Sequence, residues 1–235
     1  KVMLTVQDII DRARDQLQDT SELGYGYTYR YSDDDLMAYI TMGMRSIVRI
    51  KPSANATLFA HTCVAAPRQR LDPLVFHSIL RVQWNEPDPL SNSNAGKTIQ
   101  TVERDVFDTF YTLWPVSTAV AGEAPTRFKA ACMDAKDPLA FWLFPTPRDG
   151  DVVYVSASAI PDEVINVIDE ILIGNEYVAP LVDFVCHMAS LSVGRDEAAQ
   201  HAERYLVRFL GALGVSTAVI QEVSTNQPAA PEATE

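Results

Sequence analysis

The feature that most constrains the fold is a change of hydrophobic period along the chain. Apolar residues recur at helical spacing near both ends, whereas residues 57–159 show short β-like runs separated by turn signals. A helix buries one stripe and a strand buries one face, so each must pack against another element. The pattern predicts an α+β protein in which N- and C-terminal helices form a bundle and a β-rich module is inserted between them.

Helices are expected at both ends of the chain. The first carries an apolar stripe, and Thr5 with Asp8 resembles a capping box at its start. A second helix begins after Ser32 and ends before Pro52, because the residue that precedes a proline avoids helical geometry. Helical spacing returns near Tyr177 and continues, after one break, into a last helix.

Six short strands are expected in the middle of the chain, with one short helix around Phe107 between the third strand and the fourth. Dipeptides such as Asp72-Pro73 and Asp137-Pro138 mark turns between them. The expected strands are Leu58–Val64, Ile79–Trp84, Thr98–Val102, Thr126–Ala131, Ala140–Phe144 and Val152–Ala157.

These patterns divide the chain into four segments. Residues 1–54 hold the N-terminal helices, 55–160 the inserted β-rich module, 161–214 the C-terminal helices, and 215–235 an extended tail. The division places the two ends of the chain in one bundle, because helices that bracket an insertion bury their stripes against each other.

The tail has a composition that cannot form a core. It contains no Lys or Arg, and Gln221–Glu235 is rich in Ser, Thr, Pro, Ala and Glu. We therefore expect a partner subunit to order it, with packing onto its own subunit as the alternative. Its candidate partner-binding residues are the apolar anchors Val215, Val219, Ile220 and Val223.

The charge balance argues against a protein that clamps nucleic acid. Thirty-one Asp and Glu residues against 19 Lys and Arg give a formal charge of −12, whereas phosphate binding needs clustered basic side chains. DNA could still pass beside an acidic wall, which repels the duplex. Arg45 and Arg49 lie one helical turn apart and are candidate partner-binding residues, with a solvated helix face as the alternative.

No residue pattern indicates a catalytic, cofactor-binding or metal site. The nearest nucleotide motif is Ser91–Thr98, which ends in Gly-Lys-Thr but has Ser where a P-loop has its first glycine. It precedes a strand-like run, whereas a P-loop opens a helix whose amides bind phosphate. The four histidines lack metal-binding spacing, and Cys63, Cys132 and Cys186 lack a local protease signature. We expect no catalytic residue, cofactor or metal.

Cysteine usage and hydropathy bear on where the chain is made. Three widely spaced cysteines do not make a secreted disulfide framework and indicate reduced thiols in a cytoplasm. No run approaches the roughly 18 apolar residues of a membrane span, and the first residues do not resemble a signal peptide. We expect a protein that is made inside a cell and meets no membrane.

Several segments match, in order, the landmarks of a known family. Arg30–Leu36 looks like an Arg-Trp-Ser-Asp-x-Glu-Leu helix start, and Ile47–Ala54 is similar to an Ile-Val-x-Leu-Lys-Pro-Asp-Ala helix end. Asp137-Pro138 with Phe141–Pro145 looks like Asp-Pro…Phe-x-Val-Tyr-Pro, and Tyr177–Val185 resembles Tyr-x-x-Ala-Leu-Val-Asp-Tyr-Val. Further matches are Thr5–Arg14, Gly96–Ile99 and Val102–Arg104. Together they resemble the head-to-tail adaptors, or connectors, of short-tailed phages.

The resemblance implies a structural virion protein that forms a homo-oligomeric ring of about twelve copies. The ring would lie at the head–tail junction between the portal protein and the tail nozzle or another tail protein. Genomic DNA would pass through its lumen during ejection without specific binding, and assembly would take place in the host cytoplasm. Thr41–Arg45 and Ser190–Arg195 depart from the family pattern, and the tail has no counterpart in it.

Two other interpretations stay open. The nearer one is another head-completion or tail-tube virion protein. The more distant one is a small nucleotide-binding hydrolase, which rests only on the partial Gly-Lys-Thr motif and predicts a pocket with convergent polar groups. An adaptor predicts large flat interfaces instead.

Overall fold

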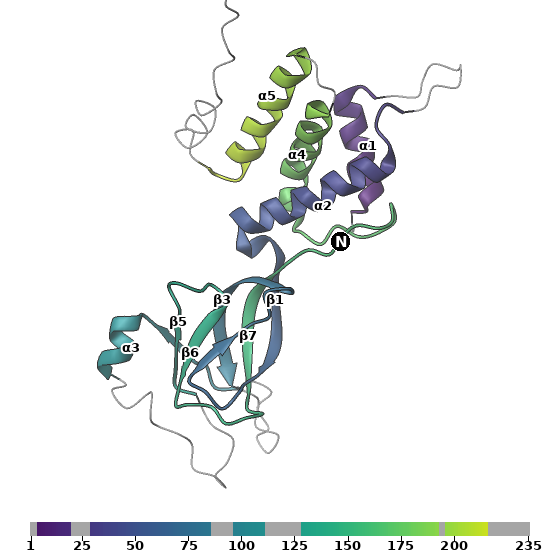
Figure 1. The fold of residues 1–235 in the computed structure, drawn as a ribbon. Coiled ribbons are helices and arrows are strands. Elements are labelled where there is room, and N and C mark those ends of the chain that lie inside the picture. The colour runs from purple at the N-terminus through teal and green to yellow at the C-terminus, as the bar shows by residue number, and fades with distance from the viewer. Residues whose placement is uncertain (1–3, 20–28, 86–95, 111–127, 193–195, 216–235) are drawn as a thin grey trace, which may run out of the picture. The chain divides into compact units, whose positions relative to one another are not determined.

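Helices and strands follow one another in the order that the hydrophobic periods predict (Figure 1). The structure, a computed structural model, describes residues 4–19, 29–85, 96–110, 128–192 and 196–215. The chain divides into two compact units: a helical unit, Lys1–Lys51 with Pro161–Glu235, and a β unit, Pro52–Ile160. The α+β class is confirmed, with helices from both ends of the chain in one unit and the strands in the other. The finer division into four segments stays a prediction.

The helical unit is built around α4. Ten of its 14 residues are buried, and it packs against α1, α2 and α5, so it has little surface left for water (Figure 1). A helix that is apolar on most sides needs this central position. In the described part of this unit, the α-helices are α1 (Val6–Leu17), α2 (Asp33–Ile50), α4 (Val178–Leu191) and α5 (Asp196–Ala212).

Caps set the bounds of the N-terminal helices as expected. The Thr5 side chain accepts from the Asp8 amide and the Asp8 carboxylate accepts from the Thr5 amide, which completes the capping box of α1. Ser32 caps α2 through the amide of Asp35. The helix ends at Ile50, two residues before Pro52 begins a short 3-10 turn (Pro52–Asn55). These local bonds satisfy amides that the first helical turn leaves without partners.

Two close contacts join the helices. Arg14 of α1 donates to the carbonyl of Tyr31 (3.2 Å) and to the carboxylate of Asp33 (2.8 Å), which holds the start of α2 against α1. Where α2 crosses α4, a Cβ added at Gly43 would lie 2.6 Å from Leu181 Cδ1. The absence of a side chain at this position is what allows the two helices to approach so closely.

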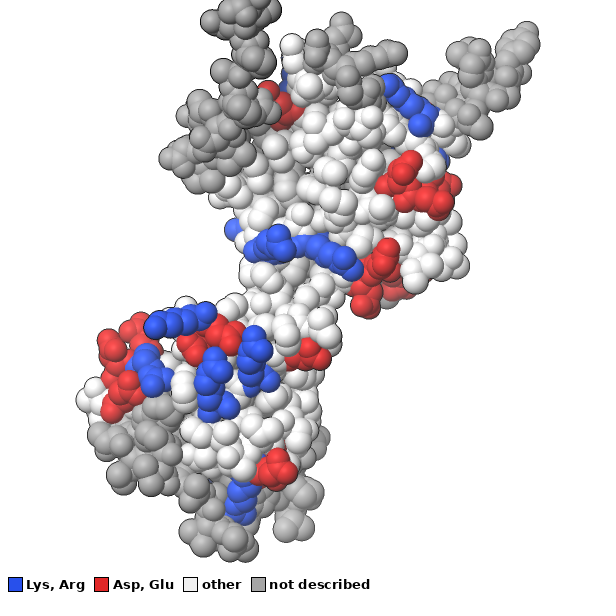
Figure 2. Space-filling model, in the orientation of Figure 1, with Lys and Arg blue, Asp and Glu red and all other residues white. Residues whose placement is uncertain are grey.

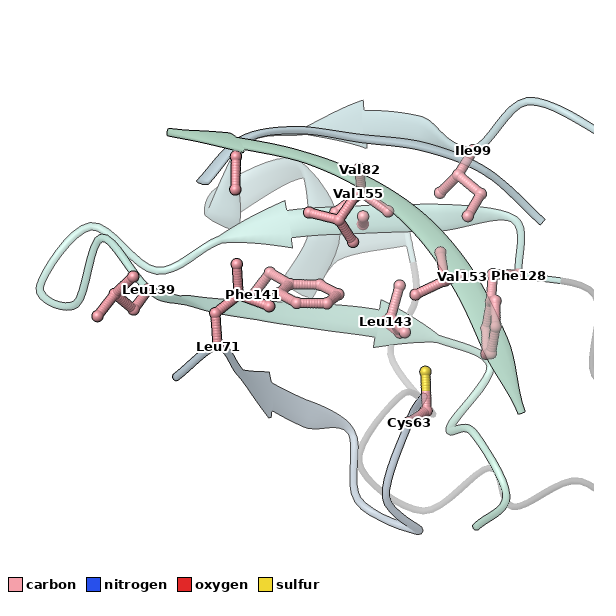
Figure 3. Close-up of a cluster of buried hydrophobic side chains, with 12 residues drawn as sticks. Cys63, Leu71, Val82, Ile99, Phe128, Leu139, Phe141, Leu143, Val153 and Val155 are labelled. Carbon is pink, nitrogen blue, oxygen red and sulfur yellow. The ribbon is translucent and has the colours of Figure 1, made fainter. Parts of the chain in front are cut away.

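The β unit consists of two sheets that share a core (Figure 3). One has the strand order β1-β7-β3 and the other β2-β6-β5-β4. All pairs are antiparallel except β4 with β5. The strands are β1 (Ala56–Thr62), β2 (Arg68–Arg70), β3 (Phe76–Asn85), β4 (Gln100–Val102), β5 (Ala130–Met133), β6 (Ala140–Phe144) and β7 (Val152–Ala159).

Alternation along the strands explains how both faces of β6 are covered. Phe141 and Leu143 point into the core shared with Val153 and Val155 of β7 (Figure 3). Trp142 and Phe144 face the other way and pack around Phe107 on the short helix α3 (Arg104–Phe110). Successive strand residues point to opposite faces, so one strand can serve two cores.

Several strand predictions need correction. β3 begins at Phe76 instead of Ile79, β4 begins at Gln100 instead of Thr98, and β7 ends at Ala159 instead of Ala157. β2 was not expected, because it has only three residues, two of them arginines. β1 runs two residues earlier than Leu58–Val64, because the amide and carbonyl of Val64 bond to the Gln69 side chain rather than to a neighbouring strand. β5 runs to Met133, and the start of the expected strand Thr126–Ala131 lies outside the described residues.

Candidate interaction surfaces

Arg45 and Arg49 lie on the exposed side of α2, one turn apart, as expected from their spacing. Nε of Arg45 donates to the carbonyl of Pro161 at 3.2 Å. Arg45 therefore fastens the chain where it enters the helical unit from β7. The structure gives this arginine a role within its own subunit, and the prediction that the pair binds a partner stays a prediction.

Residues 161–174, which begin with Pro161, form a segment that we call the arm. Its carbonyls at Val167 and Asp169 accept from the amides of Gln7 (2.8 Å) and Val6 (2.9 Å). These are first-turn amides of α1, which have no partner inside the helix. Because the arm supplies those partners, it is bound along the helical unit although it has no regular secondary structure of its own.

Two further bonds hold the arm. The amide of Ile171 donates to the carbonyl of Leu4 at 3.0 Å, and the amide of Val164 donates to Oγ1 of Thr41 at 3.1 Å. Sequence reasoning assigned no role to the arm, because its bonds run to residues more than a hundred positions away. Its run of Ile and Val residues between acids was the only local signal.

An ion network fastens β2 to the turn between β5 and β6. Arg68 reaches Asp134 (3.2 Å) and Asp137 (3.0 Å), and Arg70 also reaches Asp137 (2.9 Å). The pKa of both carboxyls is lowered, chiefly by the backbone amides of Lys136 and Leu139, which donate to them. Such bonds favour the ionised form. β2 has no apolar side chain to bury. The ion pairs of its two arginines with Asp134 and Asp137 help to hold it in place instead.

The residues around Lys97 are part of a β structure. The Lys97 carbonyl accepts from the backbone amide of Asn85 (3.0 Å) and from its side-chain amide (2.8 Å). A Cβ at Gly96 would sit directly against the Asn85 carbonyl oxygen, which explains the glycine. The strand β4 follows, as expected, and no helix begins at Thr98. This geometry lacks the helix start on which a P-loop depends, and residues 91–95 lie outside the described part.

Asn85 connects three segments of the β unit. Its buried side chain also donates to the carbonyl of Phe128 (3.0 Å) and accepts from the amide of Phe128 (2.6 Å). The chain before β5, the chain before β4 and the end of β3 therefore meet at one amide group. Sequence reasoning missed this residue, because an isolated asparagine near the end of a strand carries no pattern.

The three cysteines are free and buried. Burial raises the pKa of the Cys63 and Cys186 thiols to about 12, and it also raises the pKa of Cys132. The thiolate is the nucleophilic form, so these thiols are inert at neutral pH. Within the described ranges, no three His, Cys, Asp or Glu side chains are grouped in a way that could hold a metal ion.

No helix in the part of the chain that the structure describes has the length and apolar character that a membrane crossing requires. On the face seen in Figure 2, basic and acidic side chains form separate small groups instead of one basic stripe. Readout of nucleic-acid phosphates depends on such a stripe.

The tail anchors lie almost entirely outside the described residues. Val215 is the last described position; it is half-buried, and its amide donates to the carbonyl of Leu210 at 3.0 Å. Val219, Ile220 and Val223 lie beyond it. The partner-binding role of these four residues stays a prediction.

Comparison with known proteins identifies the family of this chain. No curated protein matches the chain. A family model described as SU10 adaptor protein matches residues 4–231, which include both units and most of the tail. The expectation that the tail has no counterpart in the family is therefore wrong. The chain therefore belongs to the SU10 adaptor protein family, in agreement with the resemblance of its motifs to phage head-to-tail adaptors.

Proposed function

We propose that this protein is a non-enzymatic part of the virion, a head-to-tail adaptor that forms a ring between the portal protein and the tail nozzle. The observation that carries the proposal is the family match over residues 4–231. The family is one of phage structural adaptors. The same role implies assembly in the host cytoplasm. It also implies a ring of about twelve copies, because head-to-tail contacts between identical subunits form a ring when the rotation between neighbours closes.

A channel through such a ring would let DNA leave the head without binding it tightly. The formal charge of −12 on each chain would give about −144 for twelve copies before counter-ions are counted. A channel wall that is acidic or mixed in charge repels the duplex or binds it only weakly, whereas layers of Lys and Arg would bind its phosphates and retain it. The charge therefore supports a conduit for DNA and argues against a DNA clamp.

The test is the mass of the assembled particle. Mass photometry of the full chain, with and without purified portal of the same phage, should show a portal complex enlarged by a ring of this chain. Binding to a purified tail tube and not to portal would favour the alternative head-completion or tail-tube role. A chain that stays monomeric with both would contradict the proposed function.

A further inference from the structure

β3 and β4 part from each other within the β unit. The chain that leads into β4 runs beside β3 as far as Ile99, whose amide donates to the carbonyl of Gln83 at 2.9 Å. The amide of the next residue, Gln100, donates to the carbonyl of Lys129 instead (3.1 Å), and β4 then pairs with β5. β3 and β4 are therefore the outer strands of two different sheets, at the place where those sheets come closest to joining.

A groove of about 550 Å³ lies where the two strands part. We call it the seam; it is lined by Leu80 and Arg81 of β3 and by Thr98–Thr101, which lead into β4. Leu80 is 37% exposed, whereas Ile99 is buried in the core that the two sheets share (Figure 3). An outer strand presents unpaired backbone N–H and C=O groups along its free edge. The seam thus combines two free strand edges with apolar side chains, which is the arrangement that an added strand fills.

The charge of the seam restricts the strand that it can receive. Arg81 lies in the lining, which contains no acidic residue, and Lys97 borders it. Both side chains are exposed, and neither forms an ion pair within the described residues. They differ in this from Arg68 and Arg70, which are paired with aspartates of their own unit. Unpaired cations attract an acidic partner and repel a basic one, so the added strand should carry negative charge and no Lys or Arg.

The tail of this chain has the composition of such a strand. Residues 215–227 contain no Gly, Pro, Lys or Arg. Four of the seven residues Thr217–Val223 are β-branched, and Val219 and Val223 fall on the same side at the period of a strand. The single charge in this stretch is that of Glu222. The family match over residues 4–231 includes the whole stretch, so it belongs to the adaptor sequence itself.

We infer that Thr217–Val223 of one copy fills the seam of the next copy as an added strand. Its backbone pairs with the free edges of β3 and β4, its valines cover Leu80, and Glu222 meets the cations of the seam. The tail follows α5 of the helical unit and the seam belongs to the β unit, so the two surfaces differ. Such a contact is head-to-tail and can close a ring. The inference rests on the proposed function, because the ring is what brings the copies together.

Disulfide trapping on the full chain, assembled with portal, tests which edge receives the tail. Thr101→Cys combined with Val219→Cys, or with Ile220→Cys for the other side of the strand, should give a ladder of covalent oligomers after mild oxidation. Ala60→Cys with the same tail cysteines is the matched control, because Ala60 is exposed on β1, the opposite outer strand of the sheet that contains β3. The native cysteines are buried, so the parent chain is the background.

Two results of this experiment would overturn the inference. A ladder of equal yield from the Ala60→Cys variants would show that the tail does not select the seam. An internal disulfide without a ladder would place the tail in the seam of its own copy.

Charge reversal gives a second measurement. Arg81→Glu should weaken ring assembly on portal about tenfold, because Glu222 then meets a like charge. Glu222→Arg should restore assembly in the Arg81→Glu background. Lys136→Glu makes the same change of charge at an exposed lysine between β5 and β6, and should leave assembly unchanged. The melting temperature of the Arg81→Glu monomer should stay near that of the parent, because Arg81 is exposed, which separates an assembly defect from a folding defect.

The outcomes distinguish this contact from the proposed function. Normal assembly of Arg81→Glu, with no ladder from the Thr101→Cys variants, would overturn the contact and leave the adaptor function standing. Failure of the parent chain to form any oligomer with portal would overturn both.

Discussion

Arg208 of α5 reaches the buried carboxylate of Asp183 on α4, with 3.1 Å between Nη2 and Oδ1. The Asp183 side chain is only 7% exposed, whereas that of Arg208 is 59% exposed. Arg208 and Asp183 form an ion pair, but Oδ1 of Asp183 accepts no well-aligned hydrogen bond. Burial raises the pKa of Asp183, and Arg208 only partly offsets this. The ionised carboxylate is therefore less favourable in the folded protein than in the unfolded chain.

Asp183→Asn should remove this cost. The pKa of Asp183 in the folded protein is raised above the ordinary value of 3.8. The free-energy cost of burying the ionised carboxylate is therefore present in full above the folded pKa and is lost as the pH falls through it. We expect the free energy of unfolding of Asp183→Asn to match or exceed the parent by up to about 1 kcal/mol near neutral pH. The difference should shrink as the pH falls through the folded pKa and vanish below the ordinary value of 3.8. Urea unfolding at several pH values measures it.

Arg208→Gln should have the opposite effect. It leaves the Asp183 carboxylate buried without a cation, which should lower the free energy of unfolding by about 1–2 kcal/mol at neutral pH. The loss should shrink as acid protonates Asp183. In the double variant with Asp183→Asn, the loss should disappear. A loss that is independent of pH and persists in the double variant would mean that Arg208 stabilises α5 by packing alone.

Gly43→Ala and Gly211→Ala are a matched pair that should change the free energy of unfolding in opposite directions. At Gly43 the new Cβ meets Leu181 and Phe184, so we expect overpacking to lower the free energy of unfolding by about 1–3 kcal/mol. At Gly211 the Cβ meets nothing, so the better helix former should raise it by about 0.5–1 kcal/mol. Chemical denaturation of the monomer measures both. Equal effects would contradict the close crossing of α2 and α4.

Asn85→Ala and Lys97→Ala test the loop that carries Gly-Lys-Thr. Removal of the Asn85 side chain leaves the Phe128 amide and the Lys97 carbonyl short of partners, and should lower the free energy of unfolding by about 2–4 kcal/mol. Lys97 is exposed, and its change to Ala should stay within about 0.5 kcal/mol of the parent.

Nucleotide binding supplies the second measurement on this loop. ATP should shift the melting temperature of neither the parent chain nor Lys97→Ala, because the residues after Thr98 form a strand. Micromolar ATP binding that Lys97→Ala abolishes would contradict the interpretation of this loop as purely structural. It would favour the nucleotide-binding hydrolase instead.

Removal of residues 215–235 tests the proposed role of the tail. The composition of the tail cannot form a core, so the melting temperature of the monomer should stay nearly unchanged. Attachment to the portal or the ring should weaken, because extended peptides bind by adding backbone hydrogen bonds or by lying in a groove. A large drop in melting temperature with normal assembly would show that the tail packs on its own subunit.

The sequence by itself determined where the two N-terminal helices begin and where α2 ends. The capping residues Thr5 and Ser32 and the stop before Pro52 act through bonds within a few positions, and the structure confirms each. The same holds for the α+β class, because the hydrophobic period is a local property. The order of motifs along the chain also led to the adaptor family.

Tertiary structure decided what depends on distant partners. β7 comes last in sequence yet lies between β1 and β3. β2 pairs with β6 and is also held by Arg68, whose aspartate partners lie 66 and 69 positions away. Asn85 becomes a junction only once Phe128 is beside it. Ile165 and Ile168 belong to an apolar run that local patterning would bury, and only the packed helical unit leaves them at the surface. Periodicity tells which residues share a face, whereas the surface that covers the face is set by the rest of the chain or by another copy.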